Sequence, residues 1–144
     1  MTERKRYDFW QAFLAYAQKN DEFKTYFGGT KKAGKDHWKN FYVSGADFYM
    51  SVVLKLGERA IALQVYFDRT TDTYYHLATQ KKEIEAEMET TYEWRENPEK
   101  KSSTIIERVD NIDFEDKEHW TTIFDFIITR TLRMREVFVK YSKQ

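Results

Sequence analysis

Two aspartates could hold a metal ion. Asp47 begins one strand-like run and Asp68 ends the next. If the two runs pair as a hairpin, the carboxylates face each other, and like charges in directly opposite positions are destabilising. A divalent ion would remove that cost, because paired carboxylates are what magnesium sites use. The alternative is that the strand ends splay and that Arg69 or a nearby lysine neutralises the two charges.

The residues between these aspartates argue against a nuclease. The expected order of elements begins helix, three strands, helix, strand, as in many restriction-type nucleases. Such enzymes place a carboxylate and a lysine two residues apart on the third strand, whereas Gln64 and Tyr66 stand there in this chain. We therefore favour a chain without this activity. A metal-dependent nuclease, or a decayed relative of one, with Asp47 and Asp68 as metal ligands, is the alternative.

A second group of residues combines an aromatic ring with positive charge. Trp94 and Arg95 are followed, across a proline-marked turn, by Lys100 and Lys101. Bases of a single-stranded nucleic acid stack on such rings while lysines meet the phosphates. The alternative is that Trp94 packs in the core, since tryptophan is highly buried on average, and that the lysines belong to a solvated turn.

Tyr49 and Tyr66 form a third candidate site. They fall opposite each other on the less apolar face of the expected hairpin. The two rings could line a groove or lie under a helix. Small residues at positions 51, 60 and 62 on the same face would allow a helix to approach closely, and this favours the second interpretation.

Several common chemistries are excluded by composition and motif. With no cysteine, the chain has no disulfide, thiolate metal site or cysteine nucleophile. Its three histidines, His37, His76 and His119, stand in no zinc-binding pattern. The sequence contains neither a phosphate-binding glycine-rich loop nor a Gly-x-Ser-x-Gly nucleophile motif. We expect no cofactor.

Charge and hydropathy narrow the partners and the location. Lys plus Arg and Asp plus Glu both number 24, so the formal net charge is zero. Non-specific nucleic-acid binding usually comes with a basic domain, so any such binding must rely on a local basic patch. The sequence shows no signal peptide and no apolar stretch of membrane-spanning length. Together with the lack of cysteine, this favours a cytoplasmic protein without a membrane partner.

One stretch predicts a β-hairpin on which the other elements pack. Apolar residues alternate with period two in 47–56 and again in 59–68, which is typical of strands with one buried face. Gly57-Glu58 between the two runs fits a two-residue type II′ turn. Because a one-residue slip would turn an apolar set to the wrong side, the register is well determined. It pairs Tyr49 with Tyr66, Met50 with Val65, and Val52 with Leu63.

The remaining elements complete an α+β fold. Besides the hairpin, periodicity predicts helices at 3–19, 73–90 and 117–141. It predicts strands at 38–43, 92–96 and 104–109, and a loop at 22–36. The order α-β-β-β-α-β-β-α predicts a mostly antiparallel five-stranded sheet with helices packed chiefly on one face. We expect a single domain over 1–144.

The chain resembles the domain of unknown function family 4268. The resemblance covers nearly the whole length and is carried by short segments, namely Arg6-Tyr7-Asp8-Phe9-Trp10, His37-Trp38-Lys39-Asn40-Phe41, Glu83-Ile84-Glu85-Ala86-Glu87, Tyr92-Glu93-Trp94-Arg95-Glu96, Lys100-Lys101-Ser102-Ser103-Thr104-Ile105 and Phe114-Glu115-Asp116 with Trp120. The family has no assigned catalytic residues. Similar domains look like C-terminal partners of nuclease-like domains in bacterial proteins, which implies a link to nucleic acid or to defence systems.

We therefore expect a soluble binding or interaction module rather than an enzyme. Its ligand would be nucleic acid, bound through a local basic patch, or a protein partner in a nucleic-acid or defence system. A homo-oligomer is a further hypothesis, because the final helix carries a wide apolar stripe. That stripe runs through Trp120, Phe124, Ile127, Thr131, Met134, Phe138 and Tyr141.

Overall fold

The structure is a computed structural model that describes residues 2–30, 32–68, 72–97, 99 and 102–144. Its helices and strands form an α+β fold, as the sequence predicts. Short 3₁₀ turns at Leu56–Glu58 and Lys117–His119 precede β3 and α5. The elements follow in the order α1 (Glu3–Ala17), α2 (Asp21–Phe27), β1 (Trp38–Tyr42), β2 (Tyr49–Lys55), β3 (Ala60–Phe67), α3 (Asp72–Ala78), α4 (Lys81–Met88), β4 (Glu93–Asn97), β5 (Ser102–Val109) and α5 (Trp120–Ser142).

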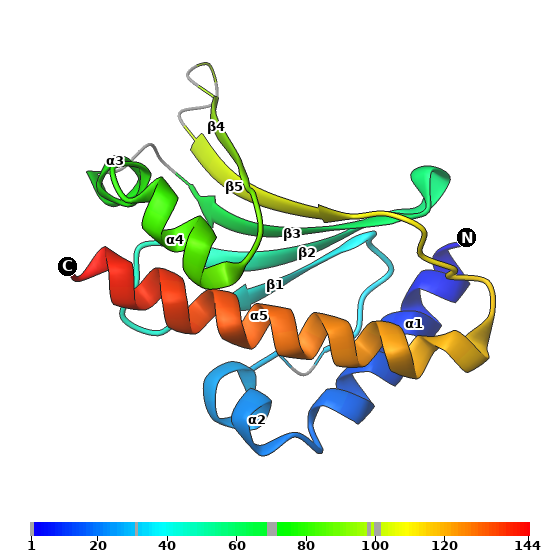
Figure 1. The fold of residues 1–144 in the computed structure, drawn as a ribbon. Coiled ribbons are helices and arrows are strands. Elements are labelled where there is room, and N and C mark those ends of the chain that lie inside the picture. The colour runs from blue at the N-terminus through cyan, green and yellow to red at the C-terminus, as the bar shows by residue number, and fades with distance from the viewer. Residues whose placement is uncertain (1, 31, 69–71, 98, 100–101) are drawn as a thin grey trace.

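The five strands form one antiparallel sheet with the order β1-β2-β3-β5-β4. Strands β1, β2 and β3 follow one another directly, whereas the chain passes through α3 and α4 before it reaches β4 at the far edge (Figure 1). In the central pair, Met50 lies opposite Val65 and Tyr49 opposite Tyr66. The predicted hairpin register is therefore confirmed.

The turn of this hairpin differs from the predicted type II′ turn. Gly57 does not take a positive φ; instead Arg59 adopts the left-handed conformation, with φ of 50°. Its backbone N–H donates to the carbonyl oxygen of Leu56 over 3.2 Å. The loop thus spans 56–59 and is closed by the pair Lys55 and Ala60. Compared with the predicted two-residue turn, the loop is longer by one residue from each strand, Leu56 and Arg59. The pairing of the two strands is therefore unchanged.

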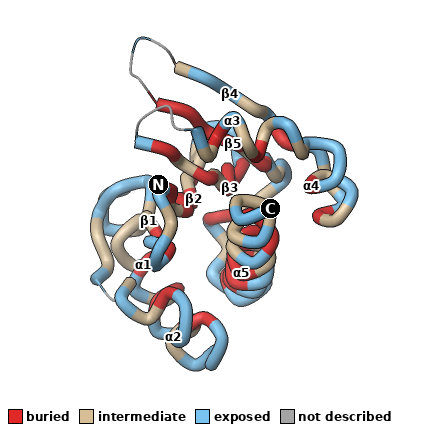
Figure 2. The backbone as a smooth tube through the Cα atoms, turned by 90° about the vertical axis from the view of Figure 1, so that its left-hand side faces the viewer, coloured by how far each residue is buried: buried red, intermediate tan, exposed pale blue. Residues whose placement is uncertain are grey.

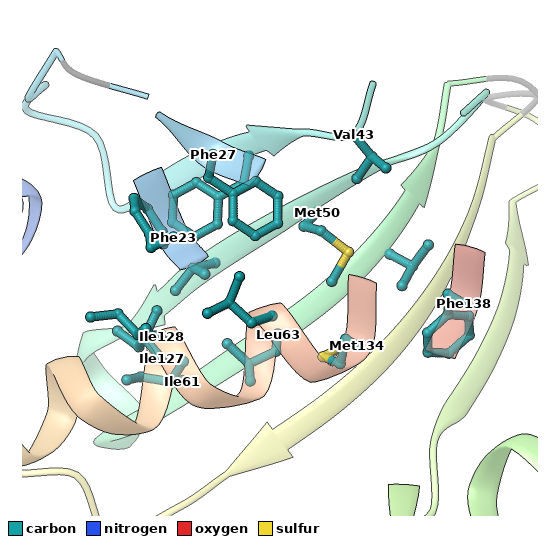
Figure 3. Packing of buried hydrophobic residues seen from close by; sticks show 14 of the residues in the cluster. Phe23, Phe27, Val43, Met50, Ile61, Leu63, Ile127, Ile128, Met134 and Phe138 are labelled. Atoms are coloured by element: carbon teal, nitrogen blue, oxygen red, sulfur yellow. The ribbon is translucent and has the colours of Figure 1, made fainter. Parts of the chain in front are cut away.

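Helix α5 lies along one face of the sheet and forms the main core with it (Figures 1 and 2). Figure 3 shows Met134 and Phe138 of α5 on the same side of the sheet as Leu63 and Met50. The apolar stripe of α5 is almost entirely buried, so it is not available for the homo-oligomer contact that the sequence suggested. No helix in the described ranges is both long and apolar enough to span a membrane.

The segment 22–36, expected to be a loop, begins with the greater part of α2. The helix starts at an N-cap, where the side-chain oxygen of Asn20 accepts the backbone N–H of Phe23 over 2.9 Å. Phe23 and Phe27 lie one helical turn apart, and both rings contact Phe41 of β1. Burial of these two rings stabilises the helix. The sequence predicts a loop here because Gly28 and Gly29 follow directly after it.

The helix expected over 73–90 is two helices, α3 and α4, which meet at Thr79 and Gln80. The Gln80 side chain donates to the carbonyl oxygen of Tyr141 over 3.0 Å and so ties the break to the end of α5. Leu77, Ile84 and Met88 are all buried, as their spacing predicts. The break falls next to Lys81, where the apolar stripe of the sequence is interrupted.

Leu63→Ala tests the core between β3 and α5. Leu63 is 0% exposed, and the substitution should lower the free energy of unfolding by about 2–5 kcal/mol, because it leaves a cavity under the helix. Denaturant unfolding followed by circular dichroism measures this change. Gln64→Ala, one residue further along and on the opposite face, is the control and should cost less than about 1 kcal/mol. Equal unfolding midpoints for Leu63→Ala and the parent would contradict this packing.

Candidate interaction surface

The sheet face opposite α5 carries no helix in the described part of the chain (Figures 1 and 2). Each of the other four described helices contacts α5, so these helices form one layer on one side of the sheet. We call the uncovered side the open face. The expectation that a helix lies over Tyr49 and Tyr66 is therefore wrong.

Five side chains form a cross-strand row over the full width of the open face. The row runs Tyr42 (β1), Tyr49 (β2), Tyr66 (β3), Thr104 (β5) and Arg95 (β4), and each is the direct partner of the next in the strand pairing. Because side chains alternate between the two faces along each strand, these partners all project to the same side. The row contains three aromatic rings at one end and a guanidinium at the other.

The three tyrosine rings pack against one another. The ring centres of Tyr42 and Tyr49 lie 5.3 Å apart with the planes at 47°, and those of Tyr49 and Tyr66 lie 5.1 Å apart at 31°. At these distances the rings overlap partly face over face rather than lying flat on the sheet. Tyr42, on the edge strand, is 67% exposed and has one ring face without a tyrosine neighbour.

The phenol of Tyr49 is held in its neutral form. Its hydroxyl donates a hydrogen bond to the Asp68 carboxylate over 3.4 Å. Burial raises the pKa of Tyr49 to about 12, and the negative charge of Asp68 and the neighbouring Tyr66 add to that shift. The Asn40 side chain donates to the Tyr42 hydroxyl over 3.5 Å. The row is thus fixed by contacts among residues of its own face.

A second row extends the open face. It runs from Trp38 on β1 through Val53 and Ala62 to Arg108 on β5. Trp38 is 42% exposed, so a second large ring is accessible on the same edge strand as Tyr42. The open face therefore has aromatic side chains along β1 and arginines along β5 and β4.

Both arginines are paired with carboxylates. Arg95 lies 2.5 Å from Glu93, its neighbour two residues back on β4. Arg108 lies 3.0 Å from Glu58 and 3.0 Å from Asp110. These exposed pairs contribute little to stability. They do neutralise the charge of the two arginines, so the positive charge that remains on the described part of the open face is that of Lys55 at the end of β2, away from the tyrosine rings.

A family model for the domain of unknown function DUF4268 matches residues 5–142. The chain belongs to the DUF4268 family. The match covers almost the whole chain and includes all five strands and every helix except the first two residues of α1. Neither the curated proteins nor the solved structures contain a match.

In the DUF4268 domain, Trp94 and Arg95 of the predicted nucleic-acid site lie on opposite faces of the sheet. Trp94 is half-buried on the helix side of the sheet, where its indole N–H donates to Glu85 over 3.2 Å. Lys81 lies over the ring at 5.4 Å from its centre. Arg95, the next residue, projects to the open face. Lys100 and Lys101 lie outside the described residues.

Asp47 and Asp68 each bond a different neighbour in the DUF4268 domain. Asp47 accepts a hydrogen bond from the Thr73 hydroxyl over 2.9 Å, and Asp68 accepts the one from Tyr49. Among the described residues, no three His, Cys, Asp or Glu side chains converge as a metal-binding group. Arg69, which could neutralise the pair, lies outside the described residues. The metal site at these aspartates remains a prediction without support from the geometry.

One hollow among the described residues lies along α1, away from the open face. It has a volume of about 640 Å³ and is lined by Tyr7, Gln11 and Gln18 of the α1 region together with Lys32 and other residues. Its lining contains no carboxylate or histidine. The described lining therefore offers no acid–base pair.

Sequence reasoning missed Tyr42 and Trp38 as members of a site. The alternation of 38–43 predicts a strand. The register between β1 and β2, which brings Tyr42 beside Tyr49, has no comparable signal in the sequence. It also missed the ion pair of Glu107 with Arg130, which joins β5 to α5 over 3.0 Å. Glu107 is only 6% exposed. Its inward position on a predicted strand is the signal that could have revealed it.

The pKa of Tyr49 is open to direct measurement. In protein labelled at the tyrosine ring carbons, the Tyr49 resonance, assigned by its loss in Tyr49→Phe, should titrate with a midpoint of about 12. Asp68→Asn should lower that midpoint but leave it above 10.0, because burial persists. Since the folded-state pKa is raised, the stability that neutral Tyr49 contributes is full below about pH 10 and is lost as pH rises through its folded-state pKa. A midpoint at 10.0 in the parent would contradict the packed row.

Proposed function

We propose that this DUF4268 domain is a non-catalytic interaction module that docks a protein partner on the open face of its sheet. The single observation that carries the proposal is the cross-strand row on a sheet face without a helix over it. Tyr49, Arg95 and Arg108 of that face are each bonded to a carboxylate, and the proposal assigns none of them a chemical step. The proposed setting is bacterial and cytoplasmic, in a nucleic-acid or defence system.

Packed tyrosines suit a protein partner. A tyrosine offers a large amphipathic contact area with few rotatable bonds, so little side-chain entropy is lost when it binds. Here the mutual packing of Tyr42, Tyr49 and Tyr66 restricts the rings further before any partner arrives. Tyrosine, tryptophan and arginine are also the residues that dominate binding energy in protein interfaces. All three types occur in the two rows of the open face.

The charges of the open face favour protein over nucleic acid. Nucleic-acid binding draws its affinity from Lys and Arg groups that neutralise phosphates. On this face Arg95 and Arg108 already pair with carboxylates. Stacking of bases would also need free ring faces, whereas those of Tyr49 and Tyr66 are partly covered by their neighbours. An uncharged aromatic centre with charges at the rim is instead the usual anatomy of a protein interface.

Site-specific photo-crosslinking tests the proposal in cells. A benzoylphenylalanine in place of Tyr66 should form adducts with a polypeptide, whereas the same group in place of Tyr26, an exposed tyrosine on α2, should not form that adduct. The captured protein is then purified and titrated calorimetrically. Tyr42→Ser should weaken its binding about tenfold, the loss expected of an interface anchor, and Tyr26→Ser should leave it unchanged.

Two results would overturn the protein version of the proposal. One is an unchanged affinity of the purified partner for Tyr42→Ser. The other is binding of a short single-stranded oligonucleotide at low salt, measured by fluorescence anisotropy, with an affinity that falls steeply as salt rises. If Lys100→Glu with Lys101→Glu removed that binding, nucleic acid would be the ligand.

A further inference from the structure

We infer that the partner of the open face is a second copy of this chain, in a two-fold symmetric dimer with the two open faces packed against each other. The inference rests on the proposed function, because it names the occupant of the same surface. It starts from the uneven distribution of side chains: aromatic rings lie on β1, β2 and β3, and arginines lie on β5 and β4.

Two copies can be placed with their open faces toward each other and related by a two-fold axis. If this axis runs parallel to β3 and midway between the two sheets, directly over that strand, the face is complementary to itself. β3 is the middle strand, so the rotation lays β1 of one copy over β4 of the other. Tyr42 then meets Arg95 of the second copy, Tyr49 comes over β5 of the second copy, and Tyr66 meets its own equivalent. Such an isologous contact uses one patch twice and closes without forming a chain of molecules. The strands of the two sheets remain roughly aligned, as in packed sandwiches.

The pairing of Tyr42 with Arg95 joins an exposed ring face to a guanidinium that is exposed at the opposite edge of the sheet. The outer ring face of Tyr42 has no tyrosine neighbour and the residue is 67% exposed. A guanidinium can stack on such a face while it keeps an ion pair, here with Glu93. The same rotation brings Arg108 of the second copy over β2, beside Trp38. The arginines thus meet aromatic rings rather than each other.

The charge and size of the surface indicate a weak dimer. The formal net charge is zero, so two copies do not repel each other strongly. Five strands at about 4.8 Å spacing and strand lengths near seven residues give a face of roughly 24 by 24 Å. That is less than the ~800 Å² per partner of a standard interface. We therefore expect association in the micromolar range.

Sedimentation velocity over a concentration series, from low micromolar to near-millimolar, tests the dimer. The sedimentation coefficient of the parent should rise from the monomer to the dimer value. Tyr42→Arg and Arg95→Glu should each weaken the dimer about tenfold or more. Tyr42→Arg places two like charges opposite each other, and Arg95→Glu removes the cation that would stack on Tyr42. Tyr26→Arg, the same change at an exposed tyrosine on α2, should leave the dimer unchanged. Thermal melts confirm that all variants are folded.

The double variant, Tyr42→Arg with Arg95→Glu, decides whether the proposed pairing is right. It restores an attractive contact between the copies, so its dimer should recover most of the lost affinity. Positions 42 and 95 stand on opposite edge strands of the sheet, so recovery cannot arise within one chain. A parent that stays monomeric at the highest concentration, a dimer insensitive to Tyr42→Arg, or additive losses in the double variant would each overturn the inference.

These outcomes also separate the inference from the proposed function. A monomeric parent whose purified protein partner still loses affinity for Tyr42→Ser would refute the dimer and leave the interaction module standing. A dimer insensitive to Tyr42→Arg, together with partner binding insensitive to Tyr42→Ser, would refute both. Benzoylphenylalanine at position 66 should link two copies of this chain in the dimer, and an adduct to a different protein alone would count against it.

Discussion

The packing of α5 along one face of the sheet is the contact on which the rest of the structure depends. Fully burying an aliphatic or aromatic side chain contributes about 1.5–3 kcal/mol each, and α5 buries ten residues, most of them apolar. The remaining described helices then gather around α5 rather than across the sheet. The apolar faces of the described helices are therefore buried on one side of the sheet. The side chains on the other side of the sheet remain at the surface of the domain.

The open face is a consequence of this one-sided packing and of strand register. Once the apolar partners Met50 and Val65 face α5, the pleat sends Tyr49 and Tyr66 to the other side together. Antiparallel pairing of β1 with β2 then adds Tyr42 at one end, and pairing of β4 with β5 adds Arg95 at the other. The same alternation that builds the core therefore builds the cross-strand row. A substitution that changes the row leaves the core residues in place, which allows binding to be tested separately from folding.

The hairpin and its register could be predicted from sequence, because two apolar alternations and one short turn agree on a single pairing. The edge strands could not be placed in the same way. The neighbours of β1 and β4 depend on tertiary packing, so the placement of Tyr42 beside the predicted pair of Tyr49 and Tyr66 has no local signal. Helix α2 was hidden by the glycines that follow it, although Phe23 and Phe27 have the spacing of a buried helical face. The break at Gln80 depends on a hydrogen bond to Tyr141, sixty-one residues away.

The central claim, that the cross-strand row lies on an uncovered face, is tested most directly by hydroxyl-radical footprinting with mass spectrometry. The purified chain is labelled at nanomolar concentration, where a dimer of micromolar affinity is mostly dissociated. Tyr42 and Trp38, at 67% and 42% exposed, should be oxidised much faster than Tyr74 and Tyr92, at 3% and 5%. Oxidation of Tyr42 and Trp38 as slow as that of Tyr74 would show that the face is covered and would contradict the account.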